Sequence, residues 1–313
     1  MFLSEDDVRA ALTYEALIPA IRAALIDYSA GRVEQPARTI LRAGNAEGWR
    51  NGWFAVMPVI HGDMMGVKTV TFFPGNAELG LHTHMAVVEL LRRSTGEPLA
   101  VMDGRLVTEM RTAAVSAVAL EALSRLHFSS PPHSLGILGS GVQARAHLEA
   151  FRLIWPQLRE VRVWSPTAAH AERLAEEANE PDRRVSATSI EVAANAEVVL
   201  TVTSAQQAAL EGRWLRGDAL VIAVGATGGS ARELDDEVMR TCFIVAESRE
   251  CVERESGDVR LSGASVQAEI GHVLANAGAA EIPRGRVLFK SVGMAIEDLT
   301  AARLVWEARS GQG

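Results

Sequence analysis

Three cationic residues in the first part of the chain have the chemistry of a carboxylate-binding site. They are Arg38, Lys68 and Arg111, and Lys68 is one of only two lysines among 31 basic residues. Lys68 lies inside an apolar run, where an unpaired ammonium is costly unless it faces a cleft or an anion. Arginine offers a bidentate fork and lysine a compact charge, so the set suits an α-carboxylate. Three separate structural ion pairs explain the same residues equally well.

A glycine-rich turn in the middle of the chain has the order that dinucleotide binding requires. The apolar run 135–138 ends in Gly-x-Gly-x-x-Ala, and a helical pattern follows from 145 to 155. The first glycine permits a tight strand-to-helix turn, and the second lets the backbone approach a pyrophosphate at the helix N-terminus. Similar turns occur without any ligand, but the strand–turn–helix context favours a cofactor. The predicted contacts are Gly139, Ser140, Gly141 and Ala144.

The strand that follows this turn bears on the choice between NAD and NADP. It ends at Ser165, where an NAD-preferring site usually carries Asp or Glu to bind the ribose 2′-OH. Because no acid repels a 2′-phosphate here, the sequence slightly favours NADP over NAD. Arg173, on the next predicted helix, is either a phosphate contact or, more simply, a solvated side chain.

His82 and His84 are candidates for proton transfer. Alternate residues of a strand face the same side, so one strand would present both imidazoles together. An imidazole in a site can protonate a substrate nitrogen, and we take His82 as the candidate, although the pattern does not decide between the two. A structural or solvent-facing pair is the simpler alternative.

Length and composition limit the class of protein. A chain of 313 residues suggests about two domains, and 48% hydrophobic with 22% charged residues is typical of a globular protein. The net charge of -8 argues against a nucleic-acid or anionic-membrane partner, and no apolar run is long enough to span a bilayer. Cys242 and Cys251 lack metal-ligand spacing, so no metal is predicted and reduced cytoplasmic thiols are expected.

The elements that must position these residues change in kind along the chain. Residues 1–31 are predicted as helices, with Ser4 and Asp7 forming a capping box and Thr13 capping a second helix. Short β-rich runs separated by turns then predict an antiparallel sheet. These runs are 39–41, 53–60, 66–73, 85–91 and 99–102.

The second half alternates between helices and strands. Helices are predicted at 112–126, 142–154, 167–178 and 295–308, and strands at 135–138, 161–164, 197–202, 219–224 and 243–246. Such alternation predicts a doubly wound parallel sheet. The predicted fold class is therefore α/β, with this parallel sheet domain beside an α+β N-terminal domain that contains an antiparallel sheet.

Four segments, in order, carry a resemblance that covers essentially the whole chain. They are residues 66–68, 106–114, 137–144 and 289–299, of which Arg-Thr-Ala-Ala from Arg111 and Phe-Lys-Ser-Val-Gly-Met-Ala-Ile-Glu-Asp from Phe289 are the specific ones. This set resembles the ornithine cyclodeaminase/mu-crystallin family. The resemblance implies hydride transfer between NAD(P)H and the α-carbon of an amino acid or its imine.

The family resemblance also implies an organisation and a set of contacts. A Rossmann domain, residues 112–290, is inserted in a substrate-binding and dimerisation domain made of 1–111 and 291–313, and two N-terminal sheets join a homodimer. Carboxylate contacts are implied at Arg38, Lys68 and Arg111. Further cofactor contacts are implied at Thr83, Arg111, Thr112, Val142, Gln143, Ser165, Thr203, Ala223, Val224, Ser291, Val292 and Gly293.

Two positions depart from the cyclodeaminases of the family. Those enzymes carry an aspartate at the position of Thr227 and a glutamate at the position of Ala55. Cyclodeamination needs acidic groups as proton acceptor and counter-ion, and neither Thr227 nor Ala55 ionises. The segment from Gly225 to Asp236 is similar instead to the ketimine reductases of the family, so Thr227 is retained as a reaction-site residue.

The expected activity is therefore an NAD(P)H-dependent reduction of an α-imino acid, such as Δ1-pyrroline-2-carboxylate. Three alternatives remain open. The first is an ornithine cyclodeaminase, which releases proline and ammonia. The second is an alanine-dehydrogenase-like enzyme, and the third is an NADPH-dependent protein that binds a ligand and catalyses little chemistry.

Overall fold

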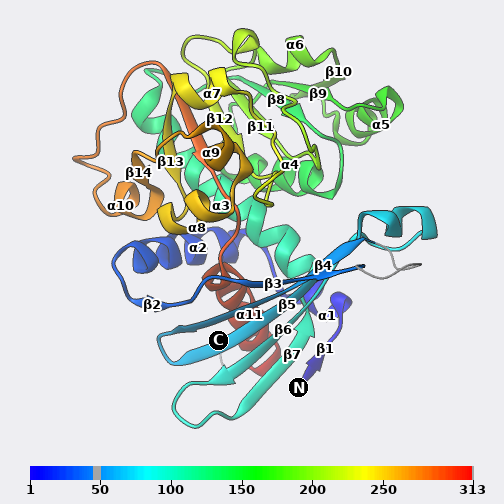
Figure 1. Ribbon diagram of the computed structural model, residues 1–313, viewed down its shortest axis with the longest axis vertical. Coiled ribbons are helices and arrows are strands. Elements are labelled where there is room, and N and C mark those ends of the chain that lie inside the picture. The colour runs from blue at the N-terminus through cyan, green and yellow to red at the C-terminus, as the bar shows by residue number, and fades with distance from the viewer. Residues whose placement is uncertain (45–50, 312–313) are drawn as a thin grey trace. The chain divides into compact units, whose positions relative to one another are not determined.

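A computed structural model describes residues 1–44 and 51–311 (Figure 1). The chain forms two compact units, of which unit 1 comprises Met1–Thr112 and Met294–Gly313 and unit 2 comprises Ala113–Gly293. Unit 2 is therefore an insertion in the sequence of unit 1. Over the described ranges, no helix combines the length and the apolar character that a membrane crossing would require.

Unit 1 is built on a mainly antiparallel sheet with the strand order β1-β7-β6-β5-β4-β2, and β3 also pairs with β4. Its strands are β1 (Phe2–Leu3), β2 (Val33–Glu34), β3 (Thr39–Ala43), β4 (Gly52–His61), β5 (Met64–Phe72), β6 (His84–Arg92) and β7 (Pro98–Asp103). The predicted antiparallel pairing is confirmed for β4 to β7, while β1 joins β7 in parallel. A short 3-10 helix, η1 (Pro74–Leu79), precedes β6.

Helices cover one face of this sheet. Helix α11 (Ala295–Ser310) packs against β4, β5 and β6 and against α2 (Tyr14–Ser29). On β4 the alternate residues Ala55, Met57 and Val59 are buried, as expected for a strand with one covered face. The predicted helix starts are confirmed: Ser4 and Asp7 form a capping box for α1 (Glu5–Ala11), and Thr13 caps α2.

Unit 2 contains a parallel sheet with the order β10-β9-β8-β11-β12-β15-β13-β14. The strands are β8 (Ser134–Leu138), β9 (Glu160–Trp164), β10 (Arg184–Ala187), β11 (Val198–Thr201), β12 (Leu220–Ala223), β13 (Cys242–Ala246), β14 (Ala268–Glu269) and β15 (Arg286–Lys290). The order reverses between β8 and β11, and ligands of doubly wound sheets bind beyond the carboxyl ends of the strands at such a point. The predicted fold class is confirmed.

Helices flank this parallel sheet (Figure 1). They are α3 (Arg105–His127), whose first residues belong to unit 1, α4 (Val142–Ile154), α5 (Ala168–Ala178), α6 (Ile190–Ala194), α7 (Asp236–Thr241), α8 (Arg249–Glu255), α9 (Gly257–Ser262) and α10 (Ile270–Ala275). A 3-10 turn, η2 (Gly212–Trp214), precedes β12.

Three local predictions differ from the structure. Helix α3 begins at Arg105 rather than at residue 112, because the Asp103 carboxylate accepts the free N–H groups of Arg105 and Leu106 and starts the helix there. Strands β10, β14 and β15 were not predicted, and β15 lies between β12 and β13. The expectation that His82 and His84 share one strand is wrong, because β6 begins at His84.

Candidate active site

The Lys68 ammonium is held on the covered face of the unit 1 sheet. Lys68 lies in the middle of β5, and its Nζ is 2.7 Å from the carboxylate of Asp298, a residue of α11. Both side chains are 2% exposed. The ammonium also donates to Thr108 Oγ1 at 3.4 Å. The costly burial of this charge is thus offset by an equally buried carboxylate.

Arg111 joins the same cluster from helix α3. Its Nε lies 3.1 Å from Asp298 and its Nη1 lies 2.5 Å from Glu297, the preceding residue of α11. Asp298 is therefore shared by Lys68 and Arg111. The alternative of separate structural ion pairs does not describe these two cations.

The cations of the cluster act on one another. Burial lowers the pKa of Lys68 to about 8; Asp298 opposes this shift, whereas the charges of Arg111 and Arg38 lower the pKa further. The half-buried Arg38, between β2 and β3, therefore acts on the same site. The charges of Lys68, Arg111 and Arg38 therefore act together at this site, beside the carboxylates of Asp298 and Glu297. Cations grouped in this way can bind the carboxylate of a ligand.

The two histidines have different environments. His84 lies on the same face of β6 as Val88, which pairs directly with Lys68. Burial lowers the pKa of His84 to about 4, and the charges of Lys68 and Arg111 act in the same direction. His84 is consequently neutral at pH 7. His82 is exposed and precedes the strand, and its backbone carbonyl accepts a hydrogen bond from Asn76.

The glycine turn of unit 2 has the shape that a pyrophosphate requires. Gly139 has φ +117°, and a Cβ there would lie 2.7 Å from the carbonyl oxygen of Val202. Gly141 caps α4 without a side-chain hydrogen bond, and a Cβ there would meet nothing within 4 Å. The side-chain oxygen of Gln143 is buried and has no partner among the described residues. Open space and an unsatisfied acceptor fit a bound dinucleotide.

Most predicted cofactor contacts gather at one edge of the unit 2 sheet. Residues 139–144 follow β8, Ser165 follows β9, Thr203 follows β11, Ala223 and Val224 end or follow β12, and Ser291 follows β15. These strands are neighbours and parallel, so their carboxyl ends lie at the same edge. The Ser140 hydroxyl donates to the Ser165 hydroxyl at 3.0 Å, which ties the ends of β8 and β9 together.

Val292 and Gly293 have their backbone N–H groups already engaged. Both N–H groups donate to the carboxylate of Glu247, a fully buried residue directly after β13. A cofactor would therefore meet this segment through groups other than these two donors. Glu247 was missed in the sequence, because a single glutamate after a strand gives no signal of what it binds.

The remaining predicted residues lie elsewhere. Thr83 and Thr112 belong to unit 1, where the Thr83 carbonyl accepts from Phe73 and the Thr112 hydroxyl donates to the Thr108 carbonyl. Thr227 is exposed in the loop after β12, directly after Ala226, whose φ of 54° is unusual for a non-glycine residue. Ala55 is fully buried on β4.

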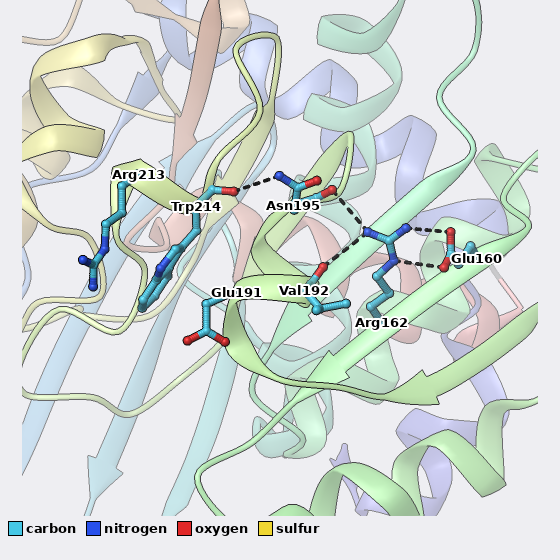
Figure 2. Close-up of a pocket in the computed structure, with 7 residues that line it drawn as sticks. All are labelled: Glu160, Arg162, Glu191, Val192, Asn195, Arg213 and Trp214. Atoms are coloured by element: carbon cyan, nitrogen blue, oxygen red, sulfur yellow. Dashed lines mark hydrogen bonds and ion pairs between the residues drawn. The ribbon is translucent and has the colours of Figure 1, made fainter.

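A pocket of about 530 Å³ in unit 2 is separate from these residues. Figure 2 shows it beside the first residues of β9, where Arg162 donates to Glu160 and to the carbonyl oxygens of Val192 and Asn195. The Asn195 amide in turn donates to the Trp214 carbonyl. The polar groups of this pocket largely satisfy one another, so the pocket shows no need for a ligand.

The chain is similar over its whole length to a protein family and to proteins of known function. Residues 1–313 match the model of the ornithine cyclodeaminase/mu-crystallin family. The chain is 41% identical over 317 residues to the ketimine reductase mu-crystallin of Mus musculus, covering 99% of this chain and 97% of that protein. It is 34% identical over 312 residues to the Δ1-pyrroline-2-carboxylate/Δ1-piperideine-2-carboxylate reductase of Azospirillum brasilense, covering 96% and 94%. The structure of Thermococcus litoralis Δ1-pyrroline-2-carboxylate reductase in complex with NADH and L-proline is similar over 100% of this chain and 98% of that chain, with a TM-score of 0.90 and 29% identity.

Proposed function

Because this chain belongs to the ornithine cyclodeaminase/mu-crystallin family, we propose that it is an NAD(P)H-dependent reductase of cyclic α-imino acids. Δ1-Pyrroline-2-carboxylate and Δ1-piperideine-2-carboxylate are the substrates that we favour. The observation that carries the proposal is the buried cluster in which the cations of Lys68 and Arg111 share the carboxylate of Asp298.

Binding starts from the cations of this cluster. They contact the substrate carboxylate, with Lys68 as a compact charge and Arg38 or Arg111 as a planar fork. Asp298 and Glu297 hold Lys68 and Arg111 in place before the substrate arrives, so little side-chain entropy is lost on binding.

Reduction then needs a hydride at the α-carbon and a protonated nitrogen. When bound, NAD(P)H supplies the hydride. A cyclic ketimine that binds as its iminium already carries the proton, so the C=N⁺–H group becomes a neutral CH–NH amine without an acid from the protein. His84, neutral at pH 7, can accept a hydrogen bond from that N–H and orient the ring.

The cofactor preference follows from the end of β9. Ser165 offers a hydroxyl where an acid would repel a 2′-phosphate, and Ser140 lies within hydrogen-bonding distance of it. We propose that NADPH binds at least as tightly as NADH.

Thr227 and Ala55 favour the reductase over the cyclodeaminase. Ornithine must give up a hydride from a carbon that bears a deprotonated amine, and a protein base has to remove that proton first. Neither Thr227 nor the buried Ala55 provides one.

The deciding experiment compares substrates on the purified protein. NADPH and NADH oxidation is followed with Δ1-pyrroline-2-carboxylate, with Δ1-piperideine-2-carboxylate, and with pyruvate plus ammonia. In a parallel assay, ammonia release is followed with ornithine and catalytic NAD. We expect turnover of the cyclic imines and none of ornithine. Sustained ammonia release from ornithine would instead identify a cyclodeaminase, and tight cofactor binding without any turnover would identify a binding protein.

We also propose that the protein is a homodimer. The face of the unit 1 sheet opposite α11 exposes large apolar side chains, among them Met85 at 39% and Val87 at 45%. Apolar residues gathered on a sheet face are typical of a protein interface. The two cysteines, Cys242 and Cys251, are buried thiols and not disulfide partners, which fits the cytoplasmic location that we also propose.

A further inference from the structure

A buried charged cluster lies at the carboxyl ends of β12 and β15, and no step of the proposed reaction uses it. Lys290, the last residue of β15, is fully buried. Its ammonium lies 2.9 Å from the carboxylate of Asp258 and donates to the carbonyl oxygen of Gly225 at 2.7 Å. Asp258, also fully buried, accepts the backbone N–H groups of Glu233 and Leu234.

Glu233 extends this cluster to β11. Its fully buried carboxylate accepts hydrogen bonds from the Thr201 hydroxyl at 2.9 Å, the Thr203 N–H at 2.6 Å and the Thr203 hydroxyl at 2.8 Å. A Cβ at Gly225 would lie 2.4 Å from the Glu233 carboxyl carbon. The Gly225 loop therefore rests directly on Glu233, and one cluster fixes the segments that follow two neighbouring strands.

Stability alone does not explain such a cluster. Burying charged groups costs free energy that their attraction barely recovers, and well-packed apolar residues often serve equally well. What the cluster uniquely provides is a fixed arrangement. It sets Thr203 after β11 against Gly225 after β12, next to Ala226 with its unusual backbone conformation.

We infer that Glu233 is a positioning residue for the nicotinamide half of the cofactor, an inference that rests on the proposed cofactor site. A doubly wound sheet consists of two mononucleotide-binding halves. The first half here is β8 to β10, which carries the glycine turn and Ser165; the second is β11, β12 and β15. Glu233, Asp258 and Lys290 contact the ends of the second half.

The test separates the two halves with two ligands. NADPH spans both halves, whereas 2′,5′-ADP has only the adenosine part. Dissociation constants of both are measured by calorimetry for the wild type and for Glu233→Ala, together with thermal midpoints. Because the variant loses three hydrogen bonds to a charged group, we expect NADPH affinity to fall by about tenfold or more while 2′,5′-ADP affinity stays within about twofold.

The chain offers a matched control at the opposite edge of the sheet. The carboxylate of Glu197, directly before β11, accepts hydrogen bonds from the His133 N–H, the Ser134 N–H and the Ser134 hydroxyl. Glu197→Ala removes the same number of hydrogen bonds, but at the amino ends of β8 and β11. We expect it to lower the thermal midpoint and to leave the affinities for both ligands within about twofold of the wild type.

Two conservative variants complete the design. Glu233→Gln keeps an acceptor oxygen for Thr203, so NADPH affinity should stay within about threefold of the wild type. Thr201→Val removes one of the three hydrogen bonds, so its NADPH affinity should also fall, but by less than that of Glu233→Ala. If Glu233→Ala does not fold, Thr201→Val is the deciding variant.

Two results would show that Glu233 acts only on stability. One is an equal loss of affinity for NADPH and 2′,5′-ADP in the Glu233 and Thr201 variants, and the other is a selective loss of NADPH affinity in Glu197→Ala. A wild type that binds neither ligand overturns the cofactor site, and this inference with it.

Discussion

The Lys68 ammonium combines two properties that a surface lysine lacks. It is buried, which weakens its hold on the proton, and Asp298 at 2.7 Å restores part of that hold. The result is a pKa of about 8, so the side chain is charged at neutral pH but titrates within the range of an enzyme assay. The apolar residues around Lys68 in the sequence predict that it is buried, but they do not predict its partner Asp298 on α11.

Replacing Lys68 tests the proposed carboxylate contact. Lys68→Ala should lower kcat/KM for a cyclic imine, because a desolvated charge partner of the substrate is lost. The fall should correspond to a loss of about 2–4 kcal/mol of transition-state stabilisation. NADPH affinity should barely change, and Lys68→Arg should recover part of the activity. A kcat/KM within about threefold of the wild type would mean that the lysine is structural.

The pH dependence of activity provides a second test of this lysine. Its pKa is lowered from 10.5 to about 8, so Lys68 is protonated below that pH and loses its charge as the pH rises through it. Carboxylate binding, and with it kcat/KM, should fall on the alkaline side. In Lys68→Arg the part of the fall that is due to residue 68 should disappear, because a guanidinium stays charged, and only deprotonation of the iminium substrate should remain. A wild-type profile that stays flat up to the pKa of an ordinary lysine contradicts the assignment.

The Ser165 position tests cofactor choice. Ser165→Asp introduces a carboxylate where a 2′-phosphate would lie. The affinity for NADPH should therefore fall relative to the affinity for NADH. Titration of both cofactors by tryptophan fluorescence measures the change. A wild type that clearly prefers NADH would remove the basis of the prediction.

At the scale of elements, the strand–turn–helix of β8 and α4 was the most predictable part. Its short apolar run, glycines and helical pattern are local in the sequence, and local patterns are what a sequence displays. Strand β15 was not predicted, although Val287, Leu288 and Phe289 are apolar, because no helix-and-turn pattern marks its start. The pairing of Arg111 with Glu297 joins residues 186 positions apart, which no local pattern reveals.

Two glycines around this turn should respond in opposite ways to the same substitution. A Cβ at Gly136, within β8, would lie 1.8 Å from the Ala193 carbonyl of α6, whereas Gly141 has open space. Gly136→Ala should therefore cost about 1–3 kcal/mol of stability or more, since the strand and helix must separate. Gly141→Ala should keep its thermal midpoint and lose NADPH affinity.

Thermal unfolding and cofactor titration of the two variants together provide the measurement. Unchanged NADPH binding in a stable Gly141→Ala protein would argue against a pyrophosphate at this turn.

At the scale of the whole molecule, the proposed homodimer depends on the exposed face of the unit 1 sheet. The sequence alone predicted a sheet, and the resemblance implied a dimer through it. What the structure adds is which side chains are exposed on the face away from α11. Val87, in the middle of β6, is 45% exposed there.

A charged substitution on this face should dissociate the proposed dimer. Val87→Arg would bury a charge at the interface, so sedimentation equilibrium should show a monomer at concentrations where the wild type is dimeric. Val192→Arg is the control, because Val192 is a similarly exposed valine, at 47%, on α6 of unit 2. A Val87→Arg protein that remains dimeric would place the interface elsewhere.

The insertion of unit 2 into unit 1 affects the order in which the nascent chain can fold. A ribosome completes β1 to β7 first, then all of unit 2, and only afterwards α11, which covers the unit 1 sheet. Until then Lys68 and Arg111 have neither Asp298 nor Glu297 beside them. Unit 2 can fold while translation continues, whereas the carboxylate site becomes complete only after α11 has left the ribosome. Unit 1, whose synthesis begins first, is thus the unit that finishes folding last.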